Sequence, residues 1–322
     1  MTTPDGAMDE VPAPRAIPYA TPEALRAAVS DRAKDAAAAQ PHYSVAERQR
    51  QFAYGRLLAR VFSDEPERWV LKGGAALLAR LPDARHSRDV DLWGGDEDLD
   101  AAERALERSA ALDLGDHMSF RVGAWRRGDL NGQPLARTML ICRIGRREFA
   151  RFGVDLVVGG LPPLEPERVA PPRPVDIPGL PEVPWRLYPI AAQVADKVAG
   201  IHKRHEERPS SRYRDLVDLA EIALTQEVAA ADLHLALHSE LPRQRVPVPA
   251  ELAVPDLDRW AAGYAQQARR LPVLDGIGFE QALALVKWLV DPVLAGRRKG
   301  AWLPGERRWS DTDAAAEPEP EL

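Results

Sequence analysis

The chain has 322 residues, of which 45% are hydrophobic and 29% are charged, and its formal net charge is −6. This composition is typical of a globular protein with a substantial core, which argues against a fibrous or wholly disordered chain. The single cysteine, Cys142, excludes an intramolecular disulfide framework and a zinc site built on cysteines. The acidic balance argues against indiscriminate binding of polyanions but is compatible with a local basic site.

Two observations concern the location of the protein. No apolar run approaches the roughly 20 residues that span a bilayer. The N-terminus lacks the basic and apolar segments of a signal peptide. We therefore expect a cytoplasmic protein without a membrane partner. Residues 1–18 and 305–322 are expected to be disordered tails, because Pro, Ala and acidic residues dominate their outer parts.

Two helices are predicted after the first tail. Thr21 is a suitable N-cap for the first helix. Ser44 begins the second, where "SVAE" is a capping box with Glu47 at its third position. A short strand, "RWVLKGG", then leads into the helix "GGAALLARL", and "SRDVDLW" is the next strand. The order predicts a strand, a helix and a second strand in close succession.

The following residues predict the rest of a mixed sheet. A charged amphipathic helix is expected at 96–114. Three more strands are expected at 119–123, 136–144 and 147–158. Residues 19–160 therefore predict an α/β domain that begins with helices.

A proline-rich segment separates this domain from the rest of the chain. Residues 161–188 are predicted to be a connection without regular structure, because proline removes backbone donors and restricts the backbone. Residues 189–304 have helical periodicity throughout. The predicted fold class is α+β, with a mixed-sheet core followed by a C-terminal helical domain.

Asp89 and Asp91 are separated by one residue in a strand, so both point to the same face. Two neighbouring carboxylates repel each other unless a cation lies between them or one is protonated. Mg²⁺ is a suitable cation, because it takes one or two carboxylates together with water and substrate phosphates. A solvated strand end with a chance pair of aspartates is the other interpretation of this motif alone.

Gly73 and Gly74 lie where the preceding strand becomes a helix. Backbone N–H groups and the helix dipole at such a position favour a phosphate, and glycine permits close approach. The alternative is an ordinary tight turn. Gly-Gly, a helix and then Asp-x-Asp resemble the nucleotidyltransferase core of the polymerase-β superfamily. That core needs a third carboxylate, for which Asp155 in "RFGVDLVV" is the candidate.

The triad of Asp89, Asp91 and Asp155 is predicted to hold two Mg²⁺ or Mn²⁺ ions. One ion would activate the attacking hydroxyl, and the other would neutralise the leaving pyrophosphate. For Asp155 alone, a strand-end residue in a turn is the competing interpretation.

A closer resemblance depends on four segments, "KGGAALLAR", "RHSRDVDL", "ADKVAGIHKR" and "RYRDLVDL". Together they are similar to the AbiEii/AbiGii toxin family of bacterial toxin–antitoxin systems, which includes the MenT toxins. The resemblance places Ser87 and Asp89 in the first motif, Lys197 in the second and Asp215 in the last. It implies transfer of a nucleotide from an NTP to RNA, for MenT members the tRNA 3′ end, which blocks translation. It also implies an antitoxin encoded nearby.

The later motifs have a physical interpretation as well. Lys197 is suited to a triphosphate, although most helical lysines are solvated. Asp215 is expected to orient Lys197 or a metal-bound water. Asp218 lies on the same helical face, and a structural role is sufficient to explain it. Asp196 is expected on the surface.

Further cations flank these motifs. Arg85 and Arg88 are candidates for contact with the triphosphate, and Ser87 is a candidate donor to phosphate or simply the first residue of its strand. An RNA backbone is the predicted partner of five cations between two helices, and a solvated loop is the equal alternative. These five are Lys203, Arg204, Arg208, Arg212 and Arg214.

Three other functions share this core. The first is a nucleotidyltransferase that acts on a small molecule such as an antibiotic, and the second is one that modifies protein side chains. The third is a nucleotide-binding regulator without catalysis, which has no need of three carboxylates. The acceptor distinguishes these enzymes from an RNA-modifying toxin.

Overall fold

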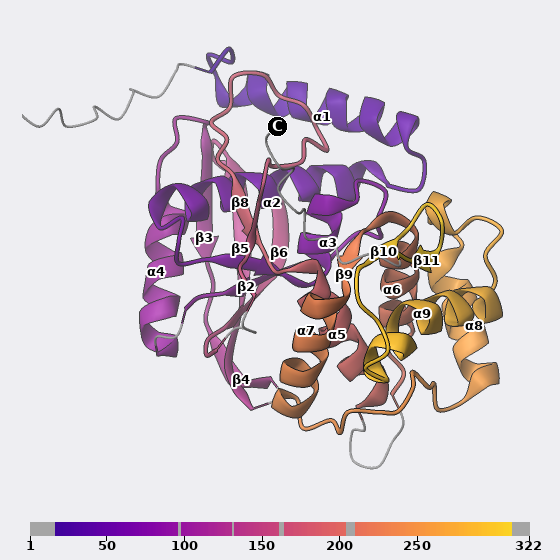
Figure 1. The fold of residues 1–322 in the computed structure, drawn as a ribbon. Coiled ribbons are helices and arrows are strands. Elements are labelled where there is room, and N and C mark those ends of the chain that lie inside the picture. Colours follow the sequence, from indigo (N-terminus) through magenta and orange to yellow (C-terminus); the bar gives the residue numbers. More distant parts are fainter. Residues whose placement is uncertain (1–16, 96–97, 131, 161–163, 204–209, 311–322) are drawn as a thin grey trace, which may run out of the picture.

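The computed structural model describes residues 17–95, 98–130, 132–160, 164–203 and 210–310. A mixed sheet with helices packed against it forms one part of the molecule, and a group of helices forms the other (Figure 1). The predicted α+β class, a mixed sheet followed by a helical C-terminal part, is confirmed. None of the described helices is long and apolar enough to cross a bilayer.

The first two helices begin where the sequence predicts. Helix α1 (Pro22–Ala39) starts after Thr21, whose side chain accepts a hydrogen bond from the backbone of Ala24. Helix α2 (Val45–Asp64) starts after Ser44, and its capping box with Glu47 is present. Each cap satisfies backbone N–H groups that have no partner within the helix.

The large sheet has the strand order β3-β5-β6-β2-β1-β8-β7, with β4 paired to β5 outside this path. Strand β2 runs parallel to β6 and β1 runs parallel to β8, whereas the other pairs are antiparallel. The strands are β1 (Val70–Lys72), β2 (Asp89–Trp93), β3 (Met118–Val122), β4 (Arg126–Leu130), β5 (Gln133–Ile144), β6 (Arg147–Val157), β7 (Glu167–Val169) and β8 (Trp185–Leu187).

Residues alternate between the two faces of this sheet. Val90 and Leu92 of β2 and Val154 of β6 are fully buried in the core that contains α2 and α4 (Leu99–Ala111). The intervening residues, which include Asp89, Asp91 and Asp155, therefore point to the opposite face. Helix α3 (Gly73–Arg80) joins the antiparallel neighbours β1 and β2.

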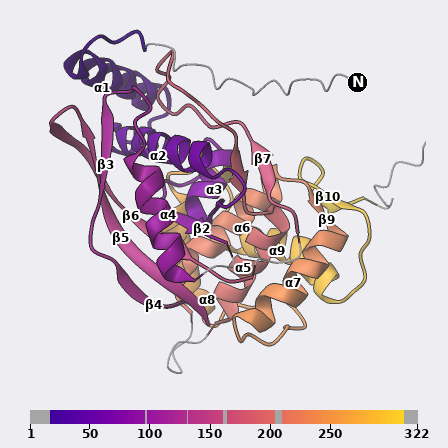
Figure 2. The ribbon, with the colours of Figure 1, turned by 90° about the vertical axis from the view of Figure 1, so that its left-hand side faces the viewer.

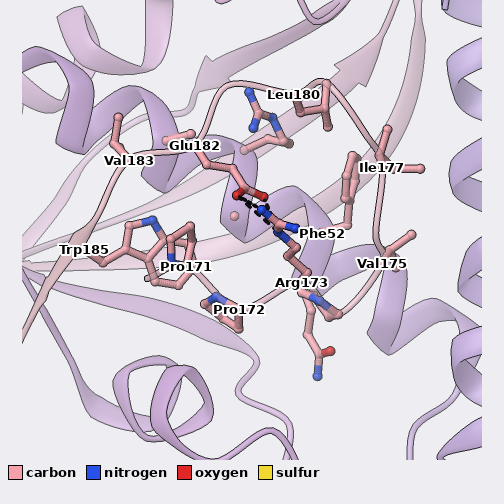
Figure 3. Close-up of a pocket in the computed structure, with 15 residues that line it drawn as sticks. Phe52, Pro171, Pro172, Arg173, Val175, Ile177, Leu180, Glu182, Val183 and Trp185 are labelled. Carbon is pink, nitrogen blue, oxygen red and sulfur yellow. Dashed lines mark hydrogen bonds and ion pairs between the residues drawn. The ribbon is translucent and has the colours of Figure 1, made fainter. Parts of the chain in front are cut away.

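The proline-rich segment contributes two strands to the sheet. Strand β8 lies beside β1 and continues the sheet to β7, so the segment is not only a connection between domains. In the loop between these strands, Arg173 forms an ion pair with Glu182 at 2.7 Å (Figure 3). The pocket in that view has a volume of about 40 Å³, and its lining includes Phe52, Trp185 and the prolines Pro171, Pro172 and Pro174.

The C-terminal part is helical, as predicted. Its helices are α5 (Ile190–His202), α6 (Tyr213–Thr225), α7 (Ala230–Arg243), α8 (Leu257–Ala268) and α9 (Phe279–Leu294). A small sheet, which the sequence pattern does not predict, joins β9 (Val228–Ala229), β10 (Ala301–Leu303) and β11 (Arg308–Trp309). Trp309 is buried, which corrects the expectation that the tail from residue 305 onward is disordered.

Candidate active site

A cleft of about 700 Å³ lies between the polar face of the large sheet and the residues of α5 and α6. It brings together residues that are far apart in the sequence. The predicted site residues that line it are Gly73, Gly74, Arg85, Ser87, Asp89, Asp91, Asp155, Lys197, Arg212, Arg214 and Asp215. Arg88 is exposed and is not among the residues that line the cleft.

The three aspartates are close neighbours in the sheet. Asp91 of β2 lies directly opposite Asp155 of β6 in the parallel register, and Asp89 is two residues away on the same face. Burial, followed by the charges of Asp89 and Asp155, raises the pKa of Asp91 to about 7. The Oγ atom of Ser87 donates to Asp89 at 3.4 Å. The carboxylates thus concentrate negative charge on one face of two paired strands.

The acids are suited to a divalent cation that shares its ligands with a substrate. No group of three or more metal-ligating side chains is already assembled within the described part of the chain. Asp155 accepts a hydrogen bond from Arg137 Nε at 2.9 Å. Because Mg²⁺ commonly binds one or two carboxylates together with water and phosphate oxygens, Asp89 and Asp91 form a suitable donor pair.

The two glycines provide space for these side chains. Gly73 has a φ of +62°, which L-residues with a side chain rarely adopt, and a Cβ here would lie 1.9 Å from Asp91 Oδ2. A Cβ on Gly74 would lie 2.8 Å from Ser87 Oγ. Gln193 of α5 donates to the carbonyl of Gly73 at 2.9 Å. The glycines therefore position the aspartate strand, in addition to the phosphate-binding role that the sequence predicts for them.

Lys197 lies within a buried ionic network. Its Nζ is 3.6 Å from Asp215 Oδ1 and contacts the carboxylate of Asp218 more closely. Arg85 donates to both oxygens of Asp218, at 2.7 and 2.8 Å. Burial by itself would raise the pKa of Asp218, but the charges of Arg85 and Lys197 outweigh it and lower the pKa to about 2. The sequence predicts Arg85 at the triphosphate. In the structure Arg85 instead binds the carboxylate of Asp218, and this carboxylate also binds Lys197.

Sequence reasoning missed several ionisable groups in the cleft, among them Asp196 and Lys72 as well as Arg137 and Arg243. Asp196 is expected on the surface from the sequence. In the structure it lines the cleft and accepts a hydrogen bond from Gln244 at 2.6 Å. Lys72 also lines it, with Nζ 4.3 Å from the ring centre of Tyr188. Burial lowers the pKa of Lys72. The available signals were a lysine directly before Gly73 and an aspartate directly before Lys197.

The cationic segment predicted to bind RNA is only partly accounted for. Arg204 and Arg208 lie outside the described residues. Arg212 forms an ion pair with Asp215 at 2.5 Å, and Arg214 donates to Gln267 at 3.2 Å. Lys203 follows α5, and burial lowers its pKa. Arg212 and Arg214 are therefore engaged with neighbouring side chains at the cleft.

The fold is similar to those of solved structures, one of which is a nucleotidyltransferase toxin. MenT4, a nucleotidyltransferase toxin from Mycobacterium tuberculosis H37Rv, matches 85% of this chain and 99% of its own length, with 20% identity and a TM-score of 0.50. JHP933 from Helicobacter pylori matches 75% of this chain and 89% of its own, with 16% identity and a TM-score of 0.40. No curated protein matches the sequence.

The sequence itself matches a family model over more than half of its length. The model describes the nucleotidyl transferase AbiEii toxin of type IV toxin–antitoxin systems and covers residues 56–285. This range includes the glycines of α3, the three aspartates and the ionic network around Lys197. The chain therefore belongs to the AbiEii family of nucleotidyltransferase toxins.

Proposed function

We propose that this nucleotidyltransferase transfers a nucleoside monophosphate from an NTP to the 3′ end of tRNA, with Mg²⁺ as its cofactor. The observation that carries the proposal is the convergence of Asp89, Asp91 and Asp155 with Lys197 in one cleft. A cluster of carboxylates facing a lysine is suited to a metal-bound triphosphate. The toxin family supports transfer chemistry and an antitoxin, and the RNA acceptor extends the resemblance described above.

In this reaction an RNA hydroxyl oxygen forms a bond to the α-phosphorus. The bond from that phosphorus to the bridging oxygen breaks, so pyrophosphate leaves with its electron pair. The bound divalent ion supplies charge neutralisation for the triphosphate. Asp89 and Asp91 would hold this ion, and Asp155 beside them would accept the proton of the attacking hydroxyl.

The remaining side chains orient these groups. Lys197 would contact the phosphates whose charge grows as pyrophosphate leaves, while Asp215 and Asp218 fix the direction of its ammonium group. Gly73 leaves the space that the carboxylate of Asp91 occupies. Extension of tRNA 3′ ends would block aminoacylation and thereby translation.

The test is to incubate the purified protein and Mg²⁺ with each α-labelled NTP and total bacterial tRNA. We expect label at the tRNA 3′ end and at least about a hundredfold loss with Asp89→Ala. Asp35→Ala is the matched control, because this aspartate is exposed on α1. Parallel reactions contain aminoglycosides or bacterial protein, and label on one of these acceptors but not on tRNA would contradict the proposal.

A further inference from the structure

The sheet face that carries the catalytic aspartates continues well beyond the cleft. Residues directly opposite each other in paired strands point to the same face. The register extends the row of Asp91 and Asp155 to Arg137 on β5 and then to Arg126 on β4. One continuous surface therefore joins the acidic cluster to the outer strands.

Arginine is the main charged residue on this continuation. Arg151 of β6 lies opposite Ile141 of β5, which in turn lies opposite Arg121 of β3. Arg143 of β5 is two residues farther along the same face, opposite Ser119. The term arginine face is used below for Arg121, Arg126, Arg143 and Arg151.

The arginine face is exposed and largely free of internal partners. All four of its side chains belong to exposed residues. Within the described part of the chain, Arg121, Arg126 and Arg143 form no ion pair, whereas Arg151 contacts Glu148 at 3.1 Å in an exposed pair. Exposed pairs of this kind contribute little to stability. No described helix lies over the outer side of β3 and β5 (Figure 2).

The centre of this face is apolar. Met139 is 49% exposed, and Ile141 beside it is half-buried. Arg127, the neighbour of Arg126 on β4, points to the other side of the sheet and pairs with Glu103 of α4. Arg126 occupies the same short strand but has no such ion pair among the described residues.

We propose that the arginine face binds the phosphate backbone of the RNA whose 3′ end enters the cleft. Guanidinium groups bind phosphate with two parallel hydrogen bonds, and their spacing over four strands suits a polymer with repeated charges. The strand register gives the path of the RNA, because the surface that carries the arginines leads to Asp155, where the acceptor hydroxyl must lie. This inference rests on the proposed function, since it needs an RNA acceptor.

The test replaces three of these arginines together, as Arg121→Gln, Arg143→Gln and Arg151→Gln. Arg137 is kept, because it contacts Asp155. The matched control replaces three exposed arginines elsewhere with the same change of charge. These are Arg104 on α4 together with Arg297 and Arg298 after α9.

Binding of fluorescent total tRNA is measured by anisotropy in salt from roughly 50 to 200 mM. We expect the arginine-face variant to bind at least about tenfold more weakly than the control. Its log–log salt slope should be shallower by about two units, because each lost contact removes roughly 0.7 to 0.9. Transfer to a trinucleotide acceptor should be unchanged, since this acceptor is too short to reach the arginine face.

The outcomes separate this inference from the proposed function. If the wild-type protein does not transfer nucleotide to tRNA, the proposed function fails and the inference fails with it. If the wild-type protein extends tRNA and the variant does so with the same KM, only the inference fails. If the variant keeps its tRNA affinity but loses binding to an acidic protein partner, the arginine face is a protein interface and the inference is overturned.

Discussion

The carboxyl group of Asp91 lies where a strand end, a glycine without a side chain and two other carboxylates meet. Each of these features follows from a short-range property of the sequence. Alternation along β2 sets the face, and the glycine preceding α3 sets the space. The pKa of about 7 for Asp91 reflects the cost of burying its charge and then of placing it beside Asp89 and Asp155 without a cation.

Replacing Asp91 should reveal that cost as a pH-dependent change in stability. When an acidic group has a higher pKa in the folded than in the unfolded protein, the free energy of unfolding falls as the pH rises from the unfolded pKa through the folded one. Without Mg²⁺, Asp91→Asn should therefore gain melting temperature relative to wild type between roughly pH 4 and 7. Added Mg²⁺ should stabilise the wild type more than the variant.

The measurement is thermal unfolding in a chelator at several pH values, followed by the same series with Mg²⁺. Asp35→Asn on α1 is the control, because this exposed aspartate is outside the cluster. A difference between Asp91→Asn and wild type that does not change with pH would contradict the assignment of the repulsion to Asp91.

The sequence predicts these aspartates better than it predicts their neighbours. A period of two is a local property, so the shared face of Asp89 and Asp91 is predictable from the strand alone. The positions of Asp196 and Lys72 depend instead on how α5 packs beside β1. Local periodicity contains no information about this packing, and Asp196 was therefore expected on the surface.

The three-stranded sheet of β9, β10 and β11 shows a similar limit among the elements. Its strands have two or three residues each, and β9 lies more than 70 positions before the neighbouring β10 and β11. Such strands have no usable periodicity. The same is true of β8, which completes the large sheet from within a run of prolines. The longer helices α5 to α9 were predictable, because each presents an apolar stripe over several turns.

Two tryptophans provide a test of this small sheet. Trp309 of β11 is 5% exposed and packs against Trp302, whereas Trp288 of α9 is 58% exposed. Trp309→Ala should lower the free energy of unfolding by about 3 to 5 kcal/mol, because it leaves a cavity. Trp288→Ala should cost less than about 1 kcal/mol. Chemical denaturation measures both, and equal losses would show that β11 does not stabilise the fold.

The two parts of the molecule are joined by buried charges as well as by apolar contacts. Arg85 precedes the strand of the predicted catalytic aspartates, and Asp218 belongs to α6 of the helical part. Asp218 also holds Lys197, so a single carboxylate links the sheet, the helical part and a predicted catalytic residue. Breaking such a link leaves buried charges without a partner.

Asp218→Asn should therefore destabilise the whole protein by about 3 to 5 kcal/mol near neutral pH. Because the folded pKa of Asp218 is lowered to about 2, its contribution is present above its unfolded pKa and is lost as the pH falls toward 2. The difference between variant and wild type should narrow below roughly pH 4. Urea unfolding across this range measures it.

Asp31→Asn is the comparison for this change, because Asp31 forms an exposed ion pair with Lys34 on α1. Its effect on stability should be much smaller than that of Asp218→Asn, because exposed ion pairs are screened by water. If both variants lose the same stability at neutral pH, the Asp218 network does not hold the two parts together.

The residues that line the cleft come from distant parts of the chain, and their order has a consequence for biosynthesis. The aspartates are complete once residue 155 is made, but Lys197 and Asp215 belong to α5 and α6, far closer to the C-terminus. Ribosomes add about 5 to 20 residues per second, and domains fold as their residues emerge. A nascent chain thus carries the acidic cluster for several seconds before the lysine arrives. We therefore expect the nascent chain to gain nucleotidyltransferase activity only after α5 and α6 have been made.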